Sequence, residues 1–146
     1  MLSALTQKNR REQPVISRLT LNKNVLEFEI DTYEIGMEEY IEAIEKYSRL
    51  CKVKDKIRRN IELAFEELVK KNILQFIEHN DDEGLPVTVT VERYGLFASP
   101  QMTITYGGDK YDPVFEGDEL SSLISRKLFR SVKHNFADKN IITIKF

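Results

Sequence analysis

The sequence predicts an α+β fold, a two-layer sandwich in which helices cover one face of a mixed β-sheet. Apolar residues alternate with polar ones in some segments and recur every three or four residues in others, as in strands and amphipathic helices. The resulting order is β-α-α-β-β-loop-α-β, whereas a doubly wound parallel sheet needs a regular alternation of strands and helices. A chain of 146 residues is long enough for one domain with its own core.

The first half of the chain is expected to contain one strand and two helices. In the strand, Leu26, Phe28 and Ile30 alternate with glutamates, which is typical of a half-buried strand. Both helices carry an apolar stripe at intervals of three and four residues, and the second one stops before Gly84 and Pro86. The expected bounds are 24–31 for the strand and 34–50 and 54–79 for the helices.

The second half is expected to contain a hairpin, a loop, a helix and a last strand. Alternating valines and threonines precede a second alternation that includes Met102, Ile104 and Tyr106, and the turn residues between them predict a hairpin. A last alternating segment runs from Ile142 to Phe146, so we expect the chain to finish inside the sheet. The expected bounds are 87–92 and 102–106 for the hairpin, 107–118 for the loop, 120–132 for the helix and 142–146 for the strand.

Residues 1–20 are expected to form a polar tail or linker, and residues 21–146 the folded domain. No run approaches the roughly 18 apolar residues that span a bilayer, so we expect a cytoplasmic protein without a membrane partner. The net charge of −2 argues against nucleic-acid binding, because phosphate backbones attract a basic excess. One cysteine and two histidines leave little material for a metal centre, and we assign no metal-binding residue.

Three segments carry a resemblance to a known family. They are Glu62-Leu-Ala-Phe-Glu-Glu-Leu-Val-Lys-Lys-Asn-Ile in the long helix, Ile104-Thr-Tyr-Gly-Gly-Asp-Lys-Tyr-Asp-Pro after the hairpin, and Gly117-Asp-Glu-Leu-Ser-Ser-Leu-Ile at the last helix. Their order and spacing resemble the GHKL ATP-binding family, whose Bergerat fold gyrase, Hsp90-type chaperones and histidine kinases share. Over about residues 24–146, the chain is most similar to the bacterial anti-sigma-factor serine kinases.

The long helix departs from the pattern that the resemblance implies. In the family, a glutamate orients the attacking group, and an asparagine four residues later holds Mg²⁺. Glu67 matches the glutamate and is the candidate catalytic residue, but Lys71 stands four residues on, and an ammonium has no lone pair for a metal. Asn72 lies one step further, about 100° around an α-helix. Lys71 either pairs with Glu67 at the surface or contacts phosphate, and Asn72 is either a hydrogen-bonded core amide or a nucleotide contact in a shifted register.

The two glycine motifs of the family are also incomplete. Tyr106 stands where the family has an adenine-binding aspartate, Gly108 matches the first glycine that follows, and Lys110 replaces the second. At the start of the last helix, Gly117 keeps one phosphate-binding glycine, and Glu119 replaces the other. As structural alternatives, Tyr106 packs in the core, Gly108 forms a turn, and the acidic residues after Gly117 cap a helix.

The resemblance, together with these shared losses, implies a regulatory domain that is degenerate in nucleotide binding and acts through protein–protein contact. Its partner would be of the sigma-factor or anti-anti-sigma type, with a homodimer as a further expectation. The acidic loop and the helix faces of residues 34–79 are the expected contact surfaces. The alternative is a competent ATP-binding domain, or a serine/threonine kinase acting on a regulatory partner. It would bind ATP or ADP with Mg²⁺ through Asn72 and the Gly107–Gly108 turn.

Overall fold

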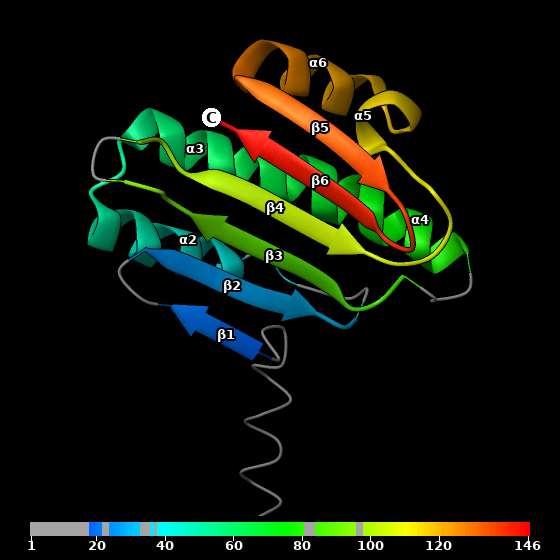
Figure 1. The fold of residues 1–146 in the computed structure, drawn as a ribbon, viewed down its shortest axis with the longest axis horizontal. Coiled ribbons are helices and arrows are strands. Elements are labelled where there is room, and N and C mark those ends of the chain that lie inside the picture. Colours follow the sequence, from blue (N-terminus) through cyan, green and yellow to red (C-terminus); the bar gives the residue numbers. More distant parts are fainter. Residues whose placement is uncertain (1–17, 22–23, 33–35, 37, 81–83, 96–97) are drawn as a thin grey trace, which may run out of the picture.

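In the part of the chain that the structure describes, six strands form one sheet with the order β1-β2-β3-β4-β6-β5 (Figure 1). The structure is a computed structural model, and it describes residues 18–21, 24–32, 36, 38–80, 84–95 and 98–146. The strands are β1 (Arg18–Leu21), β2 (Val25–Ile30), β3 (Val87–Glu92), β4 (Gln101–Tyr106), β5 (Ser131–Phe136) and β6 (Asn140–Lys145).

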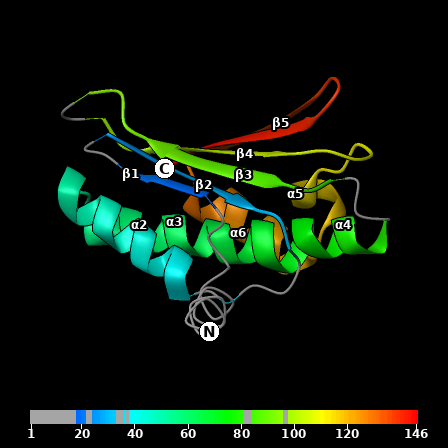
Figure 2. The same cartoon turned by 90° about the horizontal axis from the view of Figure 1, so that it is seen from below.

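The helices lie on one face of this sheet, as Figure 2 shows from its edge. They are α2 (Glu38–Cys51), α3 (Asp55–Ala64), η1 (Phe65–Ile73), α4 (Leu74–His79), α5 (Pro113–Glu116) and α6 (Glu119–Leu128). This arrangement confirms the α+β class with two layers. The segments α3, η1 and α4 follow one another without a break and make up the predicted long helix, with a π-helical middle. None of the described helices combines the length and the apolar character needed to cross a membrane.

The prediction of a mixed sheet was wrong, because all the neighbouring strands in the described sheet are antiparallel. The reason lies in the helical connection between β2 and β3. Helix α2 runs back along the sheet and the long helix returns, so the chain re-enters the sheet at the end where β2 left it (Figure 1). The predicted hairpin of β3 and β4 is confirmed.

The sequence pattern does not predict the two edge strands, β1 and β5. β1 includes Arg18, Leu19 and Thr20, which belong to the predicted tail. β5 lies where the predicted helix 120–132 would end, because α6 stops at Leu128. Val132 fits the helical spacing, but in the structure it pairs with Ile144 of β6. Because β5 has one partner strand and is largely exposed, its sequence lacks the apolar alternation of a central strand.

The core lies between the sheet and the helices. Leu26, Phe28 and Ile30 of β2 are fully buried, as their alternation predicts. Phe28 packs against Tyr40 of α2 and Phe65 of η1, with ring centroids 4.8–5.6 Å apart within this cluster. β6 lies between β4 and β5, so the last strand is inside the sheet as expected. The packing of Phe65 against Phe28 and Tyr40 fixes the long helix against the sheet, so the side chains of this helix have defined positions.

Candidate functional site

A π-helical segment sets the geometry of the candidate site. In η1, the N–H of Leu74 donates to the carbonyl oxygen of Val69, five residues earlier, whereas an α-helix would use the fourth. A π turn therefore contains one residue more than an α turn. Asn72 comes to lie over Glu67, and its Nδ2 donates to the Glu67 carbonyl oxygen at 2.6 Å. The displacement of about 100° expected for Asn72 on an α-helix is thus wrong, because the segment is not wound as one.

Asn72 joins η1 to the start of α6. Its Nδ2 also donates to Oγ of Ser121, and its Oδ1 accepts from the N–H of Asp118 at 3.2 Å. Ser121 is fully buried, and its hydroxyl donates to the Glu67 carbonyl oxygen at 3.3 Å. Both polar atoms of the Asn72 side chain therefore have partners within the protein, as a buried amide requires. This arrangement corresponds to the hydrogen-bonded core amide among the two alternatives.

Glu67 forms an ion pair with Lys71, but only the lysine is at the surface. Nζ of Lys71 lies 2.8 Å from Oε2 of Glu67, and the side chains are 45% and 3% exposed. The hydrogen bond from Lys71 to Glu67 raises the pKa of the Lys71 ammonium above its ordinary value. The other oxygen, Oε1, is buried and has no hydrogen-bond partner in the described part of the chain. Glu67 is thus a buried carboxylate with one unpartnered oxygen, whereas the sequence suggested an exposed pair.

Tyr106, at the position matched to the adenine-binding aspartate, is a core side chain. It is 1% exposed, and its hydroxyl donates to the Tyr111 carbonyl oxygen. Burial raises the pKa of the Tyr106 phenol above its ordinary value of 10, and the charge of Asp112 acts in the same direction. The Tyr111 ring stacks on Phe76 of α4, with centroids 4.0 Å apart and planes 9° from parallel. These aromatic contacts pack the end of β4 against α4.

Gly108 and Lys110 belong to the turn that follows β4. Gly108 has a φ of +81°, a conformation that residues with a side chain rarely adopt, so it has the turn geometry of the structural alternative. Lys110 is exposed. The turn is held by Asn140, which donates to the Asp109 carbonyl oxygen at 3.0 Å and accepts from the Tyr111 N–H at 2.9 Å.

The sequence interpretation missed Asn140, which is fully buried at the start of β6. Its Oδ1 also lies 2.8 Å from Nε2 of His134 on β5. A signal was present in the sequence, because Asn140 is in phase with Ile142 and Ile144, which are buried. A polar residue in phase with inward isoleucines indicates a buried hydrogen-bonding group.

Gly117 packs so closely on its neighbours that no side chain fits. An added Cβ would lie 2.3 Å from the Pro113 carbonyl oxygen and 2.5 Å from Oδ1 of Asn72. Asp118 is the N-cap of α6, and its carboxylate accepts from the Ser121 N–H at 2.8 Å. The resemblance would place phosphate at the amides that start α6. In this structure the N–H of Asp118 donates to Asn72 and the N–H of Ser121 donates to Asp118, so both amides already have partners.

The structure brings some of the predicted site residues together and separates others. Glu67, Lys71, Asn72 and Gly117 meet where η1 faces α6. Tyr106 and Gly108 lie in the aromatic region and turn at the end of β4, and Lys110 is exposed beyond them. In the first group, the buried carboxylate of Glu67 lies beside the ammonium of Lys71. The amide of Asn72 and the N–H of Asp118 at the start of α6 are already hydrogen-bonded to each other.

No protein-family model and no curated protein matches this chain in sequence. The described residues define a two-layer α+β domain in which Asn72 of η1 is hydrogen-bonded to the start of α6. A function for the chain therefore rests on the geometry given above.

Proposed function

We propose that this chain is a cytoplasmic regulatory domain of GHKL type that has lost ATP binding and acts by contacting another protein. The observation that carries the proposal is the contact of Asn72 with the start of α6. In the family that the chain resembles, an asparagine one residue earlier in the long helix holds Mg²⁺, and the amides at the start of the last helix hold phosphate. Here Oδ1 of Asn72 accepts from the N–H of Asp118, so a nucleotide would have to break this partly buried hydrogen bond to enter.

The charge near this contact supports the same proposal. The segment from residue 109 to residue 119 carries one lysine and five acidic residues, Asp109, Asp112, Glu116, Asp118 and Glu119. Such a segment repels a triphosphate unless a metal intervenes. The side chain best suited to hold that metal, Asn72, already uses its oxygen within the protein.

Exposed apolar side chains on α5 and α6 support a protein contact. Phe115 is 76% exposed, and Leu120 and Leu123 are 49% and 53% exposed. Apolar side chains that gather on a surface are typical of protein–protein interaction sites. We therefore place the partner-binding surface on α5 and α6, which extends the expected acidic loop. By resemblance, the partner is of the sigma-factor or anti-anti-sigma type.

One observation favours a second candidate, a competent ATP-binding domain or serine/threonine kinase. Oε1 of Glu67 is buried and has no hydrogen-bond partner among the described residues, and a carboxylate is one of the groups that act as a general base toward an attacking hydroxyl. In that case Asn72 would have to leave Asp118 when the nucleotide binds. The two candidates thus differ in whether the Asn72 contact opens.

Calorimetric titration with ATP and with ADP, each in the presence of Mg²⁺, tests the proposal. We expect no binding tighter than about 100 µM, which corresponds to about −5.5 kcal/mol. The matched variants are Asn72→Ala and Asn135→Ala, the second of which changes an exposed asparagine on β5. Tighter binding that Asn72→Ala abolishes and Asn135→Ala retains would establish the ATP-binding candidate instead.

Affinity purification of the tagged chain from its native cells tests the protein contact. We expect one stoichiometric partner that is lost in the double variant Phe115→Ser with Leu123→Ser and kept in the control Lys133→Ser on β5. A regulatory protein of the sigma-factor or anti-anti-sigma type would support the resemblance. Recovery of the same partner with the double variant would contradict the placement of the surface.

A further inference from the structure

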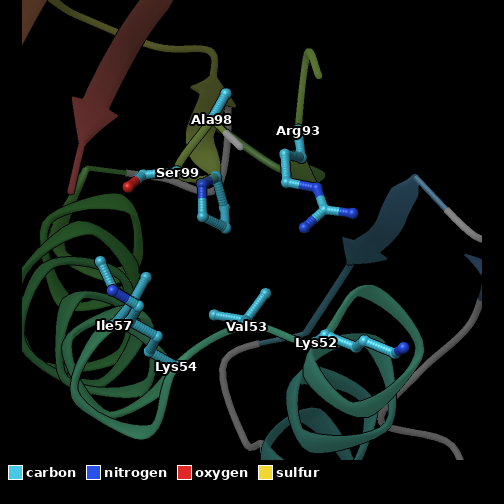
Figure 3. Close-up of a pocket in the computed structure, with 8 residues that line it drawn as sticks. Lys52, Val53, Lys54, Ile57, Arg93, Ala98 and Ser99 are labelled. Atoms are coloured by element: carbon cyan, nitrogen blue, oxygen red, sulfur yellow. The ribbon is translucent and has the colours of Figure 1, made fainter. Parts of the chain in front are cut away.

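A basic hollow lies at the end of the sheet where β3 and β4 are joined. It measures about 290 Å³, and three cationic side chains line it, Lys52 and Lys54 from the α2–α3 connection and Arg93 from the end of β3. Figure 3 shows Arg93 reaching from the strand side toward Val53 in the connection. The remaining lining is mainly apolar, from Val53, Ile57, Ala98 and Pro100, with Ser99. The hollow therefore combines positive charge with an apolar wall.

The cations of this hollow lack acidic partners in the described part of the chain, and one of them is held in place. Nη1 of Arg93 donates to the Cys51 carbonyl oxygen at 2.6 Å, which leaves further guanidinium donors for a ligand. The acids next to the α2–α3 connection contact a different cation, because Arg58 lies 3.6 Å from Glu45 and 3.9 Å from Asp55. No described residue that lines the hollow is acidic.

A second hollow of about 280 Å³ extends the basic surface. It shares Ala98, Ser99 and Pro100 with the first one and adds Arg130 and Lys145. Its described lining is also free of Asp and Glu. Together the two hollows form a continuous basic surface that borders the β3–β4 connection.

The opposite end of the molecule carries the complementary chemistry. Residues 112–119 contain the acids Asp112, Glu116, Asp118 and Glu119 and no basic residue. In the middle of this segment Phe115, on α5, exposes 76% of its surface. Figure 1 shows that β4 leads from the basic end of the sheet toward α5 at the other end. We call residues 112–119 the acidic knob.

We infer that the acidic knob of one molecule docks in the basic hollow of a second copy, so that the chain associates head to tail. The Phe115 ring would lie on the apolar wall of Val53, Ile57 and Pro100, and the flanking carboxylates would face Lys52, Lys54 and Arg93. The docking partner is a second copy because the chain itself carries an exposed aromatic side chain, Phe115, flanked by acids. Such a contact joins two different surfaces, so it builds open chains or rings and not a closed two-fold dimer.

Sedimentation velocity of the full chain tests this inference. We expect the average mass to rise above the 17.1 kDa of the monomer with concentration. The rise should be lost between about 0.1 M and about 1 M salt, because the Debye length falls from about 10 Å to about 3 Å. A chain that stays monomeric at high protein concentration in low salt would overturn the inference.

Two variants that block one end each give the decisive measurement. Phe115→Ser removes the aromatic side chain of the knob, and Lys52→Glu with Lys54→Glu reverses two exposed charges of the hollow. Each variant alone should be a monomer, whereas a one-to-one mixture should form a dimer that grows no further, because one intact end of each kind remains. The control Lys133→Glu with Lys139→Glu changes two exposed lysines elsewhere and should associate like the unmodified chain.

Other outcomes of this measurement contradict the head-to-tail contact. If either blocked variant still associates, or if the mixture remains monomeric while the unmodified chain associates, the contact is of another kind. The inference shares Phe115 with the proposed partner-binding surface, but it does not rest on the loss of ATP binding. Lys52→Glu with Lys54→Glu distinguishes the two contacts, because it should abolish self-association and leave a partner bound on α5 and α6 in place.

Discussion

Asn72→Ala should destabilise the protein because Asn72 holds η1 against α6. The side chain makes hydrogen bonds to the Glu67 carbonyl oxygen, the Ser121 hydroxyl and the Asp118 N–H. A buried hydrogen bond contributes about 0.5–1.5 kcal/mol net, so we expect the variant to lose about 1.5–4.5 kcal/mol of unfolding free energy. A domain of this size is typically stable by about 5–15 kcal/mol, so the loss is large enough to measure.

Urea unfolding followed by circular dichroism measures this loss. With a slope of about 2 kcal/mol per molar urea, the middle of the usual range, the expected loss moves the midpoint by roughly 0.8–2.3 M. The control Asn135→Ala, on the exposed part of β5, should change the free energy of unfolding by no more than about 0.5 kcal/mol.

A double-mutant cycle with Ser121→Ala separates the contact from a general effect of truncation. If the two side chains act together, the double variant should lose less stability than the sum of the single variants, with a coupling of about 0.5–3 kcal/mol. A loss under about 1 kcal/mol for Asn72→Ala, or a coupling near zero, would refute the role of Asn72 as the link between η1 and α6.

Three further predictions follow from the same region. Gly117→Ala should lose about 1–3 kcal/mol in urea unfolding, because the new Cβ would lie 2.3 Å from the Pro113 carbonyl oxygen and force α5 away from α6; an unchanged midpoint would contradict this packing. Glu67→Gln should lower the pKa of Lys71 toward its ordinary value, because the hydrogen bond to the carboxylate raises it, and NMR titration of the Lys71 ammonium measures the shift. Burial raises the pKa of Tyr111 to about 12, so the unfolded chain ionises first, and the stability that is complete below pH 10 is lost as the pH rises toward 12. Thermal unfolding over this pH range checks the sign, and a melting temperature that rises with pH would be the contrary result.

The alternation in β2 and the hairpin of β3 and β4 could be predicted because one face of each strand is buried and the other is not. β5 could not, because an edge strand without a buried apolar face has no periodic signal. The antiparallel direction of β2 and β3 could not be predicted from the sequence either. It depends on the return path of two helical segments, which no local pattern encodes.

For the candidate site, spacing predicted the pair of Glu67 and Lys71 but not the burial of the carboxylate. It also placed Asn72 wrongly, because the residues of η1 contain nothing that distinguishes a π-helix from an α-helix. In the π-helical segment, Asn72 forms hydrogen bonds with Asp118 and Ser121 at the start of α6. These partners lie 46 and 49 residues further along the chain, so no local sequence pattern could reveal them. The acidic caps were foreseeable, since Asp118 at a helix start is ordinary capping chemistry.

The π winding of η1 also determines how the long helix would respond to the loss of a residue. A π turn absorbs one extra residue without rotating the helix beyond it, so Ile61 before it and Ile77 after it both face the core. We therefore expect that deletion of Lys70 would leave Glu67 and the asparagine four residues apart, with both flanking helices still in phase. A change of one codon would then alter the spacing of these two side chains without a rearrangement of the core.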